Sequence, residues 1–368
     1  MNEGRLTTEW LMGRDVWPSQ WFPLPAKSHS KKTKTMEFTM IPIKRLFLSV
    51  TASAALLAGG VTAEARDFRL GLITPPPHIW TQAANDFATE LKEKSAGEHS
   101  VSVFPAQQLG NEAQMVQQLQ TGALDMAFLT IAEMSNRVPD FGALYTPYLV
   151  EDIDQAAALL RSDAASKLLD QLPGGVGVVG IGYGMAGMRQ VLSRESVDGP
   201  IDLEGKKLRI TPFEPIRDFY NVVGAAPTPL PLPGVYDALA NGQVDAIDMD
   251  FDSILILKFY ERADNLLISN HMMFPMVGVV SGRVWRQLSD EDKSLIQATM
   301  KTHLDSVIDR FQAQEKDQER QLRELNINIS EADRSMFSEA IESWESIWSK
   351  KAPALDSLRQ AAGELEGS

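Results

Sequence analysis

Hydrophobic and polar residues follow two distinct rhythms along most of the chain. Three runs are short and rich in apolar residues, as the strands of a buried parallel sheet are; they cover residues 68–74, 99–105 and 124–130. Between them, residues 80–94 and 112–121 carry apolar side chains at helical spacing, which predicts two amphipathic helices. The resulting order, strand–helix–strand–helix–strand, is typical of a doubly wound α/β sheet.

The same patterns continue in the second half of the chain. Residues 152–171 are predicted to form one helix, and residues 176–183 and 206–210 to form strands. Residues 289–325 contain neither Gly nor Pro and open with Ser-Asp-Glu-Asp, a sequence that favours a helix N-terminus. A helix of this length spans about 50 Å at 1.5 Å per residue. We therefore expect it to bridge two domains.

The N-terminal region carries the pattern of an export signal. Lys44-Arg45 precedes an apolar run over residues 46–58, and Ala63-Glu64-Ala65 forms a small-x-small cleavage site. Because the apolar run is shorter than the roughly 20 residues that cross a membrane, we expect cleavage near Arg66 and no stable membrane insertion of the mature protein. The first 65 residues thus divide into an extension, which is either disordered or precedes the true translation start, and a signal peptide: residues 1–35 and 36–65.

Composition excludes several functions. The chain has no cysteine, which excludes disulfides, thiolate catalysis, cysteine-ligated zinc and a lipid anchor on cysteine. It carries 35 Lys and Arg against 49 Asp and Glu, and the formal net charge of −14 repels nucleic acid. An anionic ligand would therefore have to be held by positive charge inside a binding site, because the overall field opposes it.

The most informative stretch runs from Asp202 to Asp250. Arg209 lies near the carboxyl end of the strand predicted at residues 206–210, which is where open α/β sheets bind ligands, and its planar guanidinium matches a carboxylate. This stretch resembles the solute-binding proteins of tripartite ATP-independent periplasmic (TRAP) transporters, the dicarboxylate-receptor family. The residues that match are Asp202-Leu203, Gly205, Lys207, Arg209, Pro212, Gly224-Ala225, Pro227, Pro229, Val235-Tyr236, Ala238-Leu239, Gly242 and Val244-Asp245-Ala246.

Further motifs extend the resemblance over almost the whole mature chain. Each is short, but they occur in the family's order and at its spacing. They are Leu70–Trp80, Phe104-Pro105, Gln108-Leu109-Gly110, Leu119-Gln120, Gly122, Leu124-Asp125 and Gly187–Gln190.

The resemblance implies a fold, a location and a partner. The family fold has two α/β lobes joined by crossing strands and one long helix, and the lobes close on a small organic solute. The implied function is a periplasmic receptor, not an enzyme, that delivers its ligand to the TRAP membrane permease; a sensory role would look the same in sequence. No cofactor or metal is implied. The lobes are placed at residues 66–186 with 275–314 for lobe one, and at residues 187–274 with 315–368 for lobe two.

Two arginines are the main candidates for ligand contact. The resemblance implies that Arg209 clamps a ligand carboxylate; the alternative is a surface salt bridge to one of the many acids. It also places Arg189 near the site, where it would meet a carboxylate or a hydroxyl, or else pair with an acid at the hinge.

The residues Asp248-Met249-Asp250 depart from the commoner family pattern, in which an amide often stands where Met249 stands and Pro where Asp250 stands. Met249 cannot donate a hydrogen bond to an anion, and Asp250 would repel one. We therefore expect a hydroxy acid or sugar acid rather than a plain dicarboxylate, with a neutral polyol or an amino alcohol as the alternative. A solvated loop position for Asp250 is the other interpretation.

Four further residues are candidates for ligand contact. His78 lies in the Thr-Pro-Pro-Pro-His loop after the first strand, and Thr130 ends the third strand. Tyr183 and Phe213 are aromatic side chains that could stack on a ligand, although aromatic residues lie more often in a core.

Two competing functions rest on short motifs. Gly182-x-Gly184-x-x-Gly187 follows a strand and resembles a dinucleotide fingerprint, which would make the protein a nicotinamide-dependent oxidoreductase, but the helix that should follow is broken by Gly199-Pro200. Asp248-x-Asp250-x-Asp252 begins like a calcium loop but lacks its glycine and its final glutamate.

Overall fold

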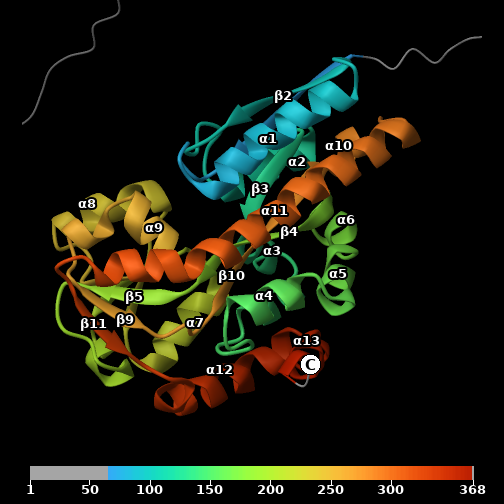
Figure 1. Ribbon diagram of the computed structural model, residues 1–368. Helices are drawn as coiled ribbons and strands as arrows, with labels where there is room; N and C mark the ends of the chain where they lie inside the picture. Colours follow the sequence, from blue (N-terminus) through green and yellow to red (C-terminus); the bar gives the residue numbers. More distant parts are fainter. Residues whose placement is uncertain (1–64, 367–368) are drawn as a thin grey trace, which may run out of the picture. The chain divides into compact units, whose positions relative to one another are not determined.

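The structure is a computed structural model that describes residues 65–366, and within them the chain forms two β-sheets flanked by helices (Figure 1). The sheet of lobe one has five strands in the order β2-β1-β3-β10-β4. The sheet of lobe two has six strands in the order β11-β9-β5-β8-β6-β7. The bounds for lobe one are β1 Arg66–Leu72, β2 His99–Phe104, β3 Met126–Thr130, β4 Val178–Met188 and β10 Met273–Ser281. Those for lobe two are β5 Gln190–Ser193, β6 Lys207–Ile210, β7 Ala226–Pro229, β8 Ala246–Met249, β9 Asn265–Ile268 and β11 Asn328–Glu331.

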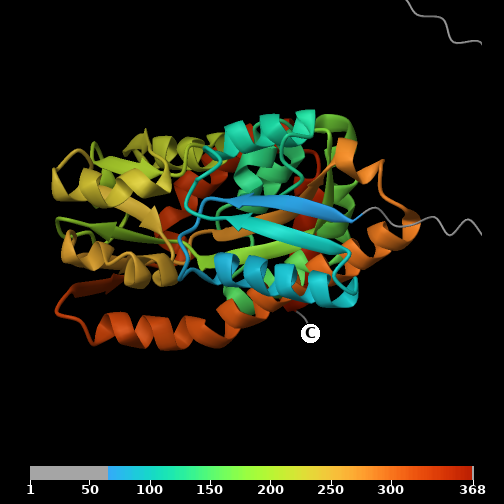
Figure 2. The same cartoon turned by 90° about the horizontal axis from the view of Figure 1, so that it is seen from above.

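Helices lie on both faces of the sheets, as the view from above shows (Figure 2). This is the layered α/β architecture that the strand and helix pattern predicts. The helices of lobe one are α1 Ile79–Lys94, α2 Glu112–Thr121, α3 Ile131–Ser135, α4 Ile153–Leu160, α5 Asp163–Leu169, α6 Leu172–Gly175 and α10 Gly282–Trp285. Those of lobe two are α7 Glu214–Val223, α8 Val235–Ala240 and α9 Phe251–Ile256. The chain ends with α12 Ser338–Lys351 and α13 Leu355–Glu366.

The chain crosses between the lobes at two neighbouring points. β4 leads directly into β5, and β9 leads back into β10, which pairs antiparallel with β4. The Arg189 backbone N–H donates to Met272 O at 2.7 Å. The Gln190 side chain accepts the backbone N–H groups of Ser269 and Asn270 at 2.8 and 3.0 Å. These bonds fasten the two crossings together beside Arg189, so that residue occupies the hinge.

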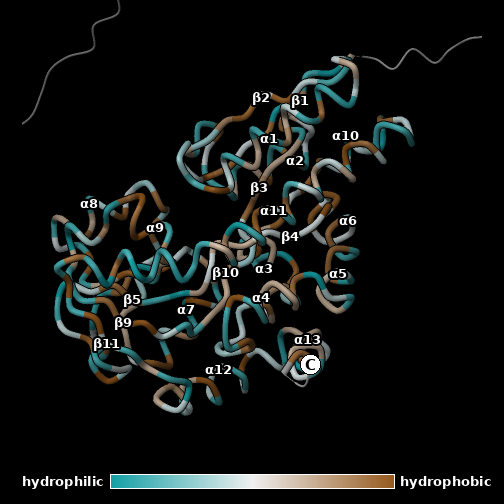
Figure 3. Tube along the Cα trace, in the orientation of Figure 1, coloured by the Kyte–Doolittle hydropathy of each residue, from teal (hydrophilic) through white to brown (hydrophobic). Residues whose placement is uncertain are grey.

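One long helix, α11 (Asp290–Arg323), spans both lobes, as predicted. Its N-cap is Ser289, whose hydroxyl accepts the Asp292 N–H at 3.0 Å. Its surface is largely hydrophilic (Figure 3). The buried face packs on α1 and β4 in lobe one and then on α9 in lobe two. That face is mostly apolar but is interrupted near the hinge: after Phe311 it presents Glu315 and Gln318, and it ends with Leu322 in the apolar cluster of lobe two.

Gly187 allows α11 to lie close to the hinge. Its φ is +78°, a left-handed conformation that favours glycine. A Cβ at this position would meet Glu315 Oε2 at 3.1 Å. Gly182, Gly184 and Gly187 all lie within β4, and the next element is the strand β5, so the helix that a dinucleotide fingerprint requires does not follow.

Two features differ from expectation. The predicted helix over residues 152–171 is two helices, because Ser162 starts a new one by accepting the Ala165 N–H at 3.2 Å. The C-terminal helix α13, expected in lobe two, packs against α4 and α5 of lobe one and against the 3₁₀ segment Pro139–Tyr145. Among the described residues there is no helix with the length and apolar character of a membrane span. The extension and signal peptide predicted at residues 1–35 and 36–65 lie outside the described residues, apart from Ala65.

Candidate functional site

A cavity of about 260 Å³ lies between the two lobes. Lobe one contributes the loop after β1, the start of α1, the N-terminus of α2, and α3; lobe two contributes the segments that follow β6 and β8. These segments lie at the carboxyl ends of parallel strands, where open α/β sheets bind ligands. The polar and aromatic residues that line the cavity are Thr74, His78, Trp80, Gln107, Asn111, Glu112, Glu133, Asn136, Arg189, Arg209, Thr211, Phe213, Asp250, Ser253 and Phe274.

Arg209 is a buried cation without a carboxylate partner in the part of the chain that the structure describes. Its side chain is 2 % exposed. Nε donates to Leu230 O at 2.9 Å, and Nη1 makes a long contact of 3.5 Å with Asp248 O. Burial and the neighbouring Arg189 lower the pKa of the Arg209 guanidinium to about 9, although the more distant charges of Asp248 and Asp250 oppose this shift. A cation in this environment favours a bound anion, because an anion would supply the missing countercharge.

Arg189, in contrast, is fully engaged with acids. Its Nε donates to Asp248 Oδ1 at 2.6 Å, and Nη1 donates to Asp250 Oδ2 at 3.0 Å. Nη2 contacts the backbone and side-chain oxygens of Asp248, and the guanidinium stacks 4.3 Å from the centre of the Phe274 ring. The alternative considered for Arg189, pairing with an acid at the hinge, describes this arrangement.

Asp248 lies behind the cavity and orients this hinge cluster. It does not line the cavity, and it is fully buried. Its Oδ2 accepts from the Tyr220 hydroxyl at 2.9 Å and lies 3.0 Å from His271 Nε2. Burial alone would raise the pKa of Asp248, but Arg189, His271 and Tyr220 together hold it well below its usual range.

Asp250 lines the cavity, yet both of its oxygens already have partners. Oδ1 caps α9 by accepting the Ser253 N–H at 2.8 Å, and Oδ2 pairs with Arg189. Asp250 is buried rather than solvated, so a surface loop position is wrong for this residue. Burial raises its pKa, which the Arg189 charge partly offsets.

The lobe-one wall of the cavity is acidic, which the sequence did not suggest. Glu112 is the first residue of α2, after the N-cap Asn111, and it accepts the Thr130 N–H and hydroxyl at 2.6 and 2.9 Å. Burial raises the pKa of Glu112 to about 7. Glu133, on α3, pairs with Arg137 at 3.3 Å, and burial raises its pKa as well. The capping box of Asn111 and Gln114 was a readable signal that a helix N-terminus lies here.

The predicted site residues divide into two groups. Arg209, Arg189, Asp250, Phe213 and His78 line the cavity.

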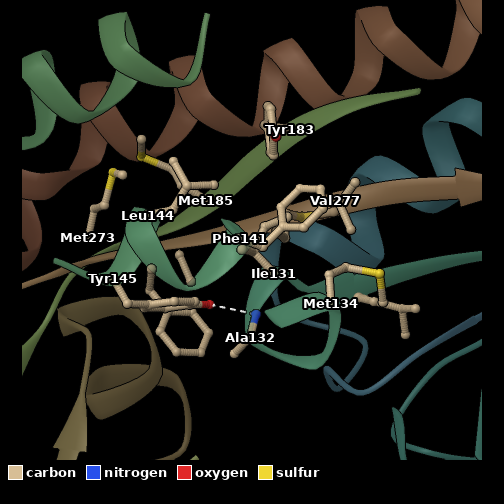
Figure 4. Packing of buried hydrophobic residues seen from close by; sticks show 14 of the residues in the cluster. Ile131, Ala132, Met134, Phe141, Leu144, Tyr145, Tyr183, Met185, Met273 and Val277 are labelled. Carbon is tan, nitrogen blue, oxygen red and sulfur yellow. Dashed lines mark hydrogen bonds between the residues drawn. The ribbon is translucent and has the colours of Figure 1, made fainter. Parts of the chain in front are cut away.

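The other three predicted residues do not line it. Asp248 lies in the hinge cluster, as described. Thr130 is buried, and it holds Glu112 in place instead of facing a ligand. Tyr183 belongs to the apolar core of lobe one (Figure 4), and its hydroxyl donates to Ala165 O at 2.8 Å. β4 turns this side chain towards the core.

His78 caps the N-terminus of α1. Its Nδ1 accepts the Trp80 N–H at 3.1 Å, so its proton lies on Nε2, which is 3.9 Å from Asp252 Oδ2. Burial, together with Arg310, lowers the pKa of His78 to about 3, so the ring is neutral at physiological pH. No group of three or more metal-ligating side chains occurs in residues 65–366.

Two α/β lobes that enclose a cavity with a free buried cation define a two-lobe binding protein for small anionic solutes. The chain belongs to family 7 of the bacterial extracellular solute-binding proteins, the family whose model matches residues 70–351. This confirms the resemblance to the TRAP solute-binding proteins and the two-lobe fold.

Individual relatives agree with this assignment. The sialic acid-binding periplasmic protein of Vibrio cholerae is 27% identical over 304 residues, which cover 82% of this chain and 94% of that protein. Among solved structures, the sugar acid binding protein of Advenella mimigardefordensis in complex with galactonate superimposes with a TM-score of 0.76 at 25% identity, covering 82% of this chain and 99% of that one. A TRAP periplasmic solute-binding protein of Bradyrhizobium in complex with galacturonate matches at 26% identity and a TM-score of 0.76, covering 81% of this chain and all of that one.

Proposed function

We propose that this protein is a periplasmic receptor for a hydroxylated monocarboxylic acid of the sugar-acid class, which it delivers to a TRAP membrane permease without chemical change. The observation that carries the proposal is Arg209. It lines the cavity, it is buried, and in the described part of the chain no carboxylate forms a direct ion pair with it, although Asp248 and Asp250 act on it from further away. A ligand carboxylate would satisfy the free edge of its guanidinium in a charge-assisted pair.

The rest of the cavity suits a polyhydroxylated body. Trp80, Phe213 and Phe274 provide aromatic faces, and aromatic rings commonly pack on the C–H faces of small ligands in binding sites. Gln107, Asn111, Asn136, Thr74, Thr211 and Ser253 provide amides and hydroxyls that both donate and accept hydrogen bonds. The galactonate and galacturonate bound by the relatives from Advenella mimigardefordensis and Bradyrhizobium have this composition, one carboxylate and several hydroxyls.

Both lobes contribute walls, so a ligand that contacts both would favour the closed arrangement of the lobes. Occupancy would thereby be transmitted to the outer surface of the protein, where a permease could sense it. No covalent step is needed for this function. The ligand should therefore leave the protein unchanged.

Isothermal titration calorimetry with galactonate tests the proposal. Arg209→Ala should weaken binding at least about thirty-fold, because truncating one partner of a buried charge pair costs on the order of 2–5 kcal/mol. Arg209→Lys should also fail substantially, since an ammonium lacks the two-pronged fork. The matched control is Arg217→Ala, which removes an arginine that lies on α7 and is paired with Asp218.

The outcome separates the remaining alternatives. Unchanged affinity in both Arg209 variants would contradict the carboxylate clamp and favour the neutral polyol. Tight binding of a nicotinamide cofactor with turnover would favour the oxidoreductase instead.

Export is a separate part of the proposal. The basic pair, apolar run and Ala63-x-Ala65 site lead us to infer that the exported protein begins near Arg66. N-terminal sequencing of the protein from the periplasmic fraction should find that start. An intact residue 1–35 segment on the exported protein would contradict it.

A further inference from the structure

The two walls of the cavity carry different ionisable groups. Lobe two presents Arg209, the free cation described above, together with the neutralised Arg189 cluster. Lobe one presents the carboxyl groups of Glu112 and Glu133, which come from the first turn of α2 and from α3. Both glutamates line the cavity, and both are more than nine-tenths buried.

Glu133 is held in position from two sides. The Tyr145 hydroxyl accepts the backbone N–H of Ala132 at 3.0 Å, which fixes the first turn of α3 (Figure 4). Arg137, just beyond the end of α3, pairs with Glu133 Oε1 at 3.3 Å from a position that is partly exposed to solvent. The Asn136 side chain also hydrogen-bonds to Glu133 and lines the cavity beside it, so hydroxyl donors from a ligand would add to the bonds that this buried carboxyl group accepts.

Glu112 has less capacity to bind a ligand. It already accepts two hydrogen bonds from Thr130, which fix its orientation. Burial raises the pKa of both carboxyl groups, to about 7 for Glu112, and the ionised fraction of each raises the electrostatic cost of a further anion on the same wall.

We propose that Glu133, supported by Glu112, makes the lobe-one wall a subsite for the hydroxyl groups at the end of the ligand distal to its carboxylate, and that this wall excludes a second carboxylate there. The inference rests on the proposed function, because it assumes that the ligand carboxylate lies at Arg209. A carboxyl group accepts hydrogen bonds from hydroxyls but repels a carboxylate at the same distance. The receptor would thus select aldonates over aldarates, the corresponding acids with a carboxylate at both ends.

Galactonate and galactarate test this directly, because they differ only at the distal carbon. That carbon is a hydroxymethyl group in galactonate and a carboxylate in galactarate. Calorimetry should find galactarate at least about tenfold weaker on the unmodified protein. Glu133→Gln should reduce the ratio of galactonate affinity to galactarate affinity by about tenfold, mainly because galactarate binds more tightly to the variant. A glutamine keeps the size of the side chain and can still bond to hydroxyls, so galactonate affinity should change by less than about threefold.

The matched control is Glu93→Gln, which removes the same charge from the exposed side of α1 and should leave the ratio unchanged. Thermal unfolding of each variant establishes that it is folded, and the ratio on the unmodified protein tests the inference even if Glu133→Gln does not fold.

Each outcome has a distinct meaning. Tight binding of both acids to the unmodified protein overturns the inference and leaves the proposed function in place. An unchanged ratio in a folded Glu133→Gln variant also overturns the role of Glu133. If neither acid binds, the proposed function and this inference both fail.

Discussion

Two guanidinium groups in the lobe-two wall of the cavity have very different surroundings. Arg189 and Arg209 are equally buried, and both reach the backbone oxygen of Asp248. Arg189 has two carboxylates, from Asp248 and Asp250, and an aromatic ring against its face. Arg209 has only carbonyl oxygens as partners among the described residues.

The difference separates a cation that is paired within the protein from one that, under the proposed function, is available to a ligand. A buried pair whose charges balance holds the protein in one arrangement, and removing one partner leaves an uncompensated charge behind. A buried cation without a counterion is costly to the free protein, and a bound anion recovers that cost. The strands place both arginines at the cavity. Their hydrogen-bond and ion-pair partners determine which of the two guanidinium groups could also bind a ligand.

The largest expected effect is on stability. Arg189→Leu should lower the free energy of unfolding by about 3–5 kcal/mol, because Asp248 and Asp250 would remain buried without their cation. Arg209→Leu should cost less than about 1 kcal/mol or even stabilise the protein, since it removes a desolvated, unbalanced charge. Urea unfolding followed by tryptophan fluorescence measures both. Equal losses in the two variants would show that the arginines have the same structural role.

A second test concerns the buried carboxyl groups near the Arg189 cluster and the dependence of stability on pH. Glu315, on α11 beside Gly187, has its pKa raised to about 8 by burial and by Asp250. The folded state binds the Glu315 proton more tightly than the unfolded state does. The stability that this proton contributes is therefore complete below about pH 4.5 and is lost as the pH rises towards 8.

Glu315→Gln should therefore raise the free energy of unfolding at pH 8 by on the order of 2–3 kcal/mol and leave it nearly unchanged at pH 4.5. Glu324→Gln, at the exposed end of the same helix, is the control. Burial and Asp250 raise the pKa of Asp252 to about 7, so this group also lowers the stability as the pH rises. The Glu315→Gln variant should therefore keep some dependence of its free energy of unfolding on pH. A variant that is no more stable than the parent at pH 8 would mean that Glu315 is ionised in the folded protein.

The third test concerns Arg209 and the pH dependence of binding. Burial and Arg189 lower the pKa of Arg209 to about 9, and only the protonated guanidinium attracts a carboxylate. Affinity for galactonate should be constant from pH 6 to 8 and decrease as the pH rises above 9. Calorimetry between pH 7 and 10.5 measures this, with circular dichroism to show that the protein stays folded. A flat profile to pH 10.5 would mean that the Arg209 charge is better compensated than its contacts indicate.

The sequence predicted the parts of this molecule that depend on local pattern. The alternation of strands and helices, the Ser289 cap of α11 and the place of Arg209 near the end of β6 are confirmed because each follows from a few neighbouring residues. The break at Ser162 was also readable, since a serine before Asp163 favours a helix start, but the apolar periodicity on both sides masked it.

The charge balance of the site could not be read in the same way. Asp248 and Asp250 meet Arg189 because β8 pairs with β5 across the sheet, a contact between residues about sixty positions apart. Glu133 follows Ala132, whose backbone N–H donates to the hydroxyl of Tyr145 from a later segment. Such partners depend on the tertiary fold, so the sequence indicated several residues that line the cavity without indicating which of their charges are paired within the protein.

The smallest effect should come from Asp250, the residue that the sequence marked as the determinant of ligand class. Both of its carboxylate oxygens are occupied, by the N-terminus of α9 and by Arg189. Asp250→Asn keeps a capping oxygen and changes only the charge beside Arg189. We expect the galactonate-to-galactarate affinity ratio to change by less than about threefold, a smaller shift than Glu133→Gln should cause. If Asp250→Asn relaxes the ratio more than Glu133→Gln does, the ligand class is set at the hinge by Asp250, and the distinction between an engaged and a free part of the lobe-two wall does not hold.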